Sequence, residues 1–152
     1  MAPRPVQAYD GTDRQVAGSN HLLGVVLWIL QASLAVVFAW AGWTKVVKVD
    51  AGLAAAVPWT TDVPAPLVRV IGVCEVLGAV GLVLPAMTRI RPKLTPIAAS
   101  FLTTVMALAV MFHLYRGEVR ILIVPSLLGA ASALVAWGRF RKVPVAPRFD
   151  RG

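Results

Sequence analysis

Four long apolar runs constrain the fold of this chain more than any other feature of its sequence. They occupy residues 22–44, 70–88, 94–115 and 121–138, and each reaches the about 17–25 residues that a helix needs to cross a bilayer. Only helices and closed barrels satisfy every backbone group in lipid, and continuous rather than alternating runs exclude a barrel. With 58% hydrophobic and 14% charged residues, the chain also lacks the charge that covers a soluble domain. The sequence therefore predicts an all-α fold, a transmembrane four-helix bundle.

The connection between the first two runs is the longest one in the predicted bundle. Residues 46–66 contain three prolines, and their apolar piece, residues 51–57, is too short to span a membrane. We expect a short interfacial helix between helices 1 and 2, with Trp59 at the level of the lipid headgroups.

The distribution of basic residues predicts the orientation of the bundle. Four spans place both termini and the second connection on one side of the membrane. That side carries ten Lys and Arg residues: Arg4, Arg14, Arg89, Arg91, Lys93, Arg139, Arg141, Lys142, Arg148 and Arg151. The other side carries five: Lys45, Lys48, Arg69, Arg116 and Arg120. The positive-inside rule then places both termini in the cytoplasm. We also expect Arg139, Arg141 and Lys142 to contact anionic lipid headgroups, the alternative being that they act only as topology signals.

The bundle and its termini define three segments. Residues 1–20 and 140–152 contain prolines and few apolar residues, so we expect a mobile cytoplasmic N-terminus and a basic cytoplasmic tail. Residues 21–139 form the four-helix membrane domain. A cleaved signal peptide is the alternative for the first run, because residues 39–41 resemble a small-x-small cleavage site; the run is longer than the usual about 7–15 apolar residues.

Several function classes are excluded by what the sequence lacks. The net charge of +8 is explained by topology, and no nucleic-acid-binding module is present. A single cysteine, Cys74, rules out a disulfide within the chain. We find no phosphate loop or catalytic triad, and no ligand set for haem, flavin or iron–sulfur. His113 has no second ligand at i+3 or i+4, so we expect no metal site.

Glu75 is the clearest functional candidate, because an ionisable residue inside a membrane is costly. It lies near the middle of the second run, and Gly72, Gly78 and Ala79 share its helical face. Small faces are where membrane helices approach each other, so we expect Glu75 to point into the bundle. Two readings stay open: a hydrogen-bonded structural carboxylate that joins two helices, or a proton-exchanging or ligand-binding group.

Three further polar residues are candidates for the same site. Gln31 and Lys45 share one face of the first helix with Phe38 and Gly42, and His113 ends an inward face of the third helix. We expect Lys45, rather than His113, to pair with Glu75: helical rise separates the Cα atoms of Glu75 and His113 by about 9 Å in height, whereas the long lysine stem can reach down. Lys45 as an interfacial anchor and His113 as a polar anchor are the alternatives.

Small residues predict where the helices pack most closely. We assign this role to Gly42, Gly72, Gly78, Ala79 and Gly129. On the fourth helix the predicted packing face also includes Ser126, Ala133 and Ala136.

Several motifs, in order, resemble the DoxX-like family of small bacterial membrane proteins. They are GVCEVLGAVGLVLP at 72–85, RIRPKLTP at 89–96 and FHLYRGE at 112–118, and AGWTK at 41–45 is similar to the family's Gly-x-x-Lys. The resemblance covers residues 36–120 and implies a four-helix bundle in the bacterial cytoplasmic membrane. It also implies a redox setting, since the family takes its name from a subunit associated with quinone-linked thiosulfate oxidation.

Two classes of function follow from these residues and this resemblance. In the first, the chain is a redox-associated subunit whose core binds a quinone-like ligand or another lipid, with no cofactor held by the chain itself. If it has catalytic activity, it is as a quinone-linked oxidoreductase subunit without its own metal or flavin. In the second, it is a non-enzymatic assembly protein that holds other membrane or redox proteins or forms a homo-oligomer. A small transporter is the weaker third reading, because no inverted repeat or pair of broken helices is visible.

Overall fold

The computed structural model describes residues 11–49 and 52–148, including the side chains of all of these except 11–19, 55 and 56. Four long helices form the bundle: α1 (Gly11–Lys48), α3 (Ala65–Thr88), α4 (Leu94–Tyr115) and α5 (Ile123–Trp137). Four short elements connect or extend them: α2 (Leu53–Ala56), the 3₁₀ turns η1 (Pro58–Thr61) and η2 (Val119–Leu122), and the π-helical turn η3 (Gly138–Lys142). Four helical segments are long and apolar enough to cross a membrane, so the predicted all-α fold is confirmed.

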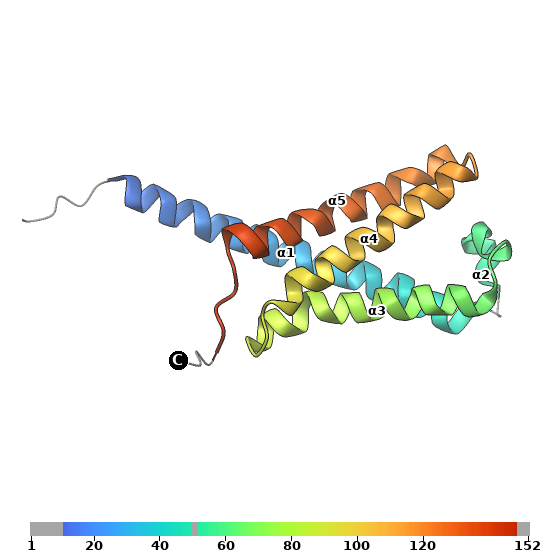
Figure 1. The fold of residues 1–152 in the computed structure, drawn as a ribbon, viewed down its shortest axis with the longest axis horizontal. Helices are drawn as coiled ribbons and strands as arrows, with labels where there is room; N and C mark the ends of the chain where they lie inside the picture. The colour runs from blue at the N-terminus through green and yellow to red at the C-terminus, as the bar shows by residue number, and fades with distance from the viewer. Residues whose placement is uncertain (1–10, 50–51, 149–152) are drawn as a thin grey trace, which may run out of the picture.

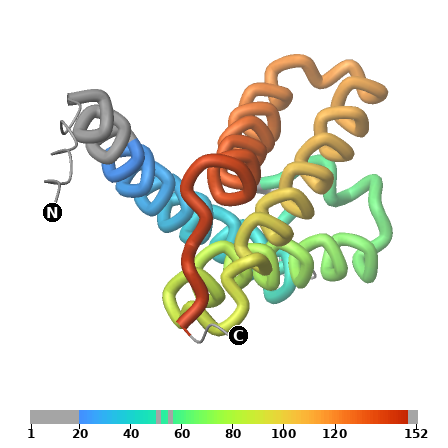
Figure 2. Tube along the Cα trace, turned by 60° about the vertical axis from the view of Figure 1, so that its left-hand side comes forward, coloured from blue at the N-terminus to red at the C-terminus, as the bar shows by residue number. Residues whose placement is uncertain are grey.

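The long helices are arranged as two pairs. Helix α1 packs mainly against α3, and α4 packs mainly against α5. Figure 1 shows the α4/α5 pair diverging from α1 and α3 toward the end of the bundle that carries α2. Figure 2 shows the same divergence from a second direction. We call this the Lys45 end, after the residue near the end of α1, and call the opposite end, where η3 lies, the Arg139 end.

Two glycines bring α1 and α3 into backbone contact. A Cβ added at Gly42 would lie 2.5 Å from the carbonyl oxygen of Gly72, and a Cβ added at Gly72 would lie 2.7 Å from the carbonyl oxygen of Gly42. No side chain fits at either position without moving a helix. This crossing holds α1 against α3 just beside Glu75, because the Glu75 Cβ would lie 3.0 Å from the same added atom at Gly42.

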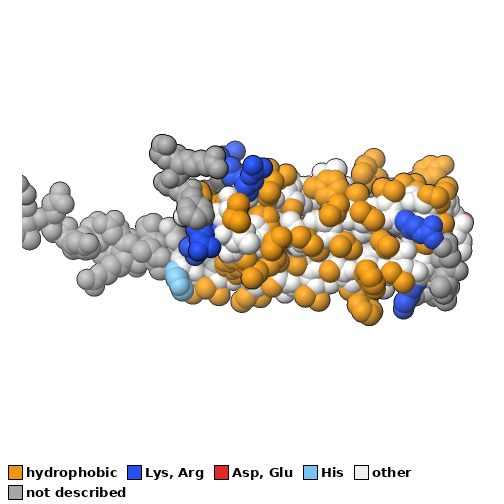
Figure 3. Space-filling model, turned by 90° about the horizontal axis from the view of Figure 1, so that it is seen from below, with side chains coloured by type: hydrophobic (Ala, Val, Ile, Leu, Met, Phe, Trp, Pro, Cys, Tyr) orange, Lys and Arg blue, Asp and Glu red, His pale blue; other side chains and the backbone are white. Residues whose placement is uncertain are grey.

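The core is apolar and narrow, as expected when most of the apolar surface faces lipid. Its buried members come from all four long helices: Leu27, Leu34, Phe38, Ala79, Leu82, Ala99, Leu102, Met106, Val135 and Ala136. Many other large apolar side chains are exposed, among them Val36 and Trp40 on α1 and Leu127 on α5. Figure 3 shows apolar side chains across the middle of one face, with Lys and Arg at its two ends. The four apolar helices and this surface describe a multi-pass membrane protein.

Several segments differ from the sequence-based expectations. Helix α1 already begins at Gly11, because hydropathy marks only the apolar part of a helix and a polar helical turn can continue beyond the bilayer. Of the predicted N-terminal segment, residues 1–10 lie outside the described residues. The predicted interfacial helix at 51–57 is reduced to the four residues of α2, followed by a separate 3₁₀ turn that carries Trp59.

The first part of the C-terminal tail contacts the rest of the bundle. Val143 packs against the core, and the backbone N–H of Arg148 donates to the carbonyl oxygen of Arg89 at 2.9 Å. Figures 1 and 2 show the tail crossing from α5 toward the turn between α3 and α4. Residues 149–152 lie outside the described residues.

The packing face of α5 was predicted incorrectly in part. Ala136 is buried and Gly129 is half-buried, but Ser126 and Ala133 are exposed. The buried residues of α5 are Pro125, Ser132, Val135 and Ala136. Pro125 and Ser132 are buried where Ser126 and Ala133 were expected, so this part of the packing face is offset by one residue from the predicted one.

Candidate functional site

A cavity of about 600 Å³ lies at the Lys45 end, between the two helix pairs. All four long helices and the connection that carries η1 line it. Most of its lining is apolar, and the ionisable side chains in the lining are Lys45, Glu75, His113 and Cys74. Its size and its few polar groups are typical of a site for a small apolar molecule.

Lys45 and Glu75 form an ion pair within this lining. Lys45 Nζ donates to Glu75 Oε2 at 2.6 Å, and both side chains are largely buried, with 12% and 5% of their surfaces exposed. The crossing of α1 and α3 at Gly42 and Gly72 sets the two Cα atoms close enough for this contact. The predicted preference of Glu75 for Lys45 over His113 is confirmed.

His113 pairs with Glu118 instead of Glu75. The Nδ1 atom of His113 lies 2.6 Å from Glu118 Oε2, and five residues separate the two along the chain. Hydrogen bonds from His113 and then Arg116 hold the pKa of the Glu118 carboxyl below its ordinary value of 4.5. An ionised carboxylate is only an acceptor, so the proton between the two groups lies on Nδ1.

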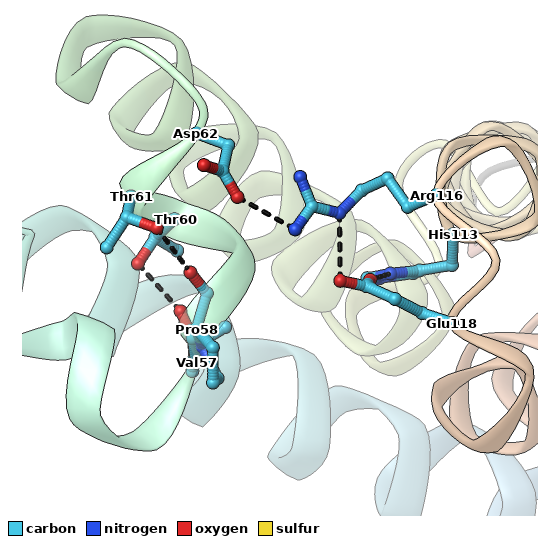
Figure 4. A network of polar contacts seen from close by, with 8 residues as sticks. All are labelled: Val57, Pro58, Thr60, Thr61, Asp62, His113, Arg116 and Glu118. Atoms are coloured by element: carbon cyan, nitrogen blue, oxygen red, sulfur yellow. Dashed lines mark hydrogen bonds and ion pairs between the residues drawn. The ribbon is translucent and has the colours of Figure 1, made fainter.

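Arg116 extends this contact to the connection between α1 and α3. Its Nε donates to Glu118 Oε1 at 2.9 Å, and its Nη2 lies 2.7 Å from Asp62 Oδ2. Figure 4 shows Arg116 between the two carboxylates, with His113 behind Glu118. The network of Asp62, Arg116, Glu118 and His113 therefore ties η1 to the end of α4. Sequence reasoning missed this network, because it joins residues from two separate connections.

An aromatic cluster lies beside the same network. The rings of Trp59, Phe112 and His113 contact each other edge to face, with centroids 5.4–6.2 Å apart. All three residues line the cavity. Trp59, expected only to mark the membrane surface, thus contributes to the site.

Gln31 lies in a different cluster, at the Arg139 end. Its Nε2 donates to the carbonyl oxygen of Leu82 at 2.7 Å, and its Oε1 accepts from Arg139 Nε at 2.6 Å. Arg139 is buried, with 5% exposed, and its guanidinium stacks over Trp28. The expectation that Arg139 contacts lipid headgroups is wrong, because Arg139 continues the buried face of α5, three residues beyond Ala136. Arg141 and Lys142 are exposed.

The predicted packing residues lie at helix contacts. A Cβ added at Gly78 would meet the side chain of Leu102 at 2.5 Å, and one added at Gly129 would meet Met106 Cβ at 3.1 Å. Ala79 belongs to the buried core. Cys74 is a free, half-buried thiol in the cavity lining. Among the described side chains, no group of three or more His, Cys, Asp or Glu could hold a metal ion.

Comparison with known proteins identifies the class of this bundle. The family model described as the DoxX-like family matches residues 29–135. The chain belongs to the DoxX-like family. No curated protein and no solved structure matches it.

Proposed function

We propose that this protein binds a quinone-like lipophilic molecule in the cavity at the Lys45 end and serves as a membrane subunit in a redox setting. The single observation that carries the proposal is an apolar cavity of about 600 Å³ that contains one buried ion pair, Lys45–Glu75. Burying an ion pair in a membrane is costly. Contact between this pair and the polar head of a ligand would explain why the protein keeps the pair despite that cost.

The splayed arrangement of the helices supports entry from the lipid. Leu67 and Val70 on α3, Leu108 on α4 and Val124 on α5 line the cavity and are also exposed on the outside of the bundle. In a bilayer these side chains face acyl chains, so a lipophilic molecule reaches the cavity without passing through water. A redox partner would supply any electron transfer, because we expect the chain to hold no cofactor of its own.

Cys74 provides a test that needs no added label, because it is the one cysteine of the chain and it lines the cavity. We would measure the rate of its alkylation by N-ethylmaleimide in the purified full chain, with and without decylubiquinone. Saturable protection is the expected result. As a matched control, a Cys74→Ala, Ala107→Cys variant carries its thiol at an exposed position of α4 outside the lining, where the quinone should not protect it. Equal rates for Cys74 with and without decylubiquinone would contradict the proposal.

A Glu75→Gln variant then separates the two readings of the carboxylate. The amide keeps the shape and much of the hydrogen bonding of Glu75. Because the amide no longer compensates the charge of Lys45, protection is measured on the fraction that folds. A ligand-binding carboxylate loses the protection of Cys74 in that fraction, which is the outcome expected here, whereas a purely structural carboxylate retains it.

A further inference from the structure

We propose that His113 accepts a hydrogen bond from a hydroxyl group of the bound molecule, so that the cavity selects a neutral, hydroxyl-bearing aromatic lipophile such as a quinol or an alkylphenol. This inference rests on the proposed function and names the ligand class of the same cavity. It depends on three features of the described residues: the fixed proton of the imidazole, the surrounding aromatic rings, and the absence of a free cation in the lining.

The proton on the imidazole is positioned by Glu118. The carboxylate lies 2.6 Å from Nδ1 and also accepts from Arg116, and both contacts favour its ionised, acceptor-only form. In the tautomer whose single hydrogen lies on Nδ1, the ring presents a lone pair at Nε2. Nε2 has no hydrogen-bond partner within the described part of the chain, and it is not completely buried. Because His113 lines the cavity, this lone pair is available to a hydroxyl donor there.

The rings around His113 favour an aromatic head. Trp59 and Phe112 meet His113 and each other at interplanar angles of 69–82°. Edge-to-face contacts of this kind are favourable for aromatic rings in general. A ligand ring bound beside His113 therefore contacts apolar side chains with its faces, and its hydroxyl group donates to Nε2.

The charges of the lining favour a neutral molecule. Lys45 is the cation in the cavity lining, and Glu75 already pairs with it at 2.6 Å. Arg116, just beyond, is shared between Asp62 and Glu118. A phosphate or carboxylate head would have to break one of these pairs, whereas a phenolic hydroxyl does not.

The test compares two redox-inert probes that differ in one hydrogen-bond donor. We would measure protection of Cys74 by 4-decylphenol and by 4-decylanisole in the purified full chain. Loss of one hydrogen bond worth about 1.4 kcal/mol is tenfold in affinity, so we expect the phenol to bind about tenfold more tightly than the anisole. In a His113→Phe variant the ratio should fall to about one, through loss of phenol affinity alone.

Equal affinities of the two probes for the unaltered chain would overturn the inference, and so would a ratio that His113→Phe leaves unchanged. If that variant does not fold, the ratio is measured in Glu118→Ala, which removes the carboxylate that holds hydrogen on Nδ1, and the ratio should fall there too; an unchanged ratio would contradict the role of His113. If decylubiquinone and 4-decylanisole protect Cys74 as well as the phenol, the cavity binds lipophiles and only the role of His113 is wrong. If none of the three molecules protects Cys74, both the proposed function and this inference are wrong.

Discussion

The Lys45–Glu75 pair is the most consequential contact between single residues in this bundle. Breaking a buried ion pair by removing one partner leaves an uncompensated charge, which costs about 3–5 kcal/mol, whereas replacing both partners by apolar residues is often neutral. We therefore expect Lys45→Met to lower the free energy of unfolding in detergent by about 3 kcal/mol. The double variant Lys45→Met, Glu75→Leu should recover most of that loss. Additive effects of the two substitutions, measured in a double-mutant cycle, would show that the pair contributes nothing.

Glu118 makes the stability of the protein depend on pH in the acidic range. Its folded-state pKa lies below 4.5, because His113 and then Arg116 donate to it. A depressed carboxyl pKa adds stability that is complete above the unfolded-state value and is lost as the pH falls through the folded-state value. We expect the unfolding free energy to fall as the pH drops below 4.5, and to fall less in a Glu118→Gln variant. Superimposable pH profiles for the two proteins would contradict this role of Glu118.

The sequence predicted the orientation of single side chains best where the position of the residue on one helix determines it. Glu75, His113 and Gln31 are buried as their helical faces required, and Lys45 reaches Glu75. The partners of His113 and Gln31 were not predictable in the same way. Glu118 lies in an irregular turn, and Arg139 lies just beyond the predicted end of the fourth apolar run, where a basic residue is expected at the membrane surface.

At the scale of elements, the crossing of α1 and α3 depends on glycine. We expect Gly42→Ala and Gly72→Ala each to lower the unfolding free energy by about 1–3 kcal/mol, because overpacking forces backbone shifts. Gly24→Ala is a matched control on α1: its added Cβ would lie 3.7 Å from Val143 Cγ1, an ordinary contact. There the gain in helix propensity should make the change neutral or slightly stabilising. Comparable losses at all three positions would show that the α1/α3 contact is not specific.

The apolar parts of the four long helices were predictable because lipid imposes a length and an apolar composition, whereas the polar start of α1 at Gly11 was not. Helix α4 matches its predicted range, Leu94–Tyr115. The connections were harder to predict, since their conformation depends on tertiary contacts. The segment that carries η1 is held by the ion pair between Asp62 and Arg116, which joins residues far apart in the sequence.

At the scale of the whole molecule, the two ends of the bundle differ in charge. The acidic side chains that the structure describes, Asp62, Glu75 and Glu118, all lie toward the Lys45 end, and the Arg139 end is basic. By the positive-inside rule we predict that the Arg139 end, with both termini, faces the cytoplasm. In a Cys74→Ala background, cysteines introduced at Ser19 or Arg148 should not react with an impermeant thiol reagent applied to intact cells. Labelling of either position in intact cells, without permeabilisation, would show that the orientation is the opposite of the predicted one.

The claim that the cavity holds a lipophilic molecule is tested most directly by what the protein retains when it is purified from its native membrane in mild detergent. We would identify the extracted lipophiles by mass spectrometry for the unaltered chain, for Ala109→Phe, which fills the cavity, and for Ala107→Phe, which faces outward on the same helix. We predict an aromatic, hydroxyl- or carbonyl-bearing lipophile with the unaltered chain and with Ala107→Phe, and its loss with Ala109→Phe. The same set of lipids from all three proteins would contradict the account.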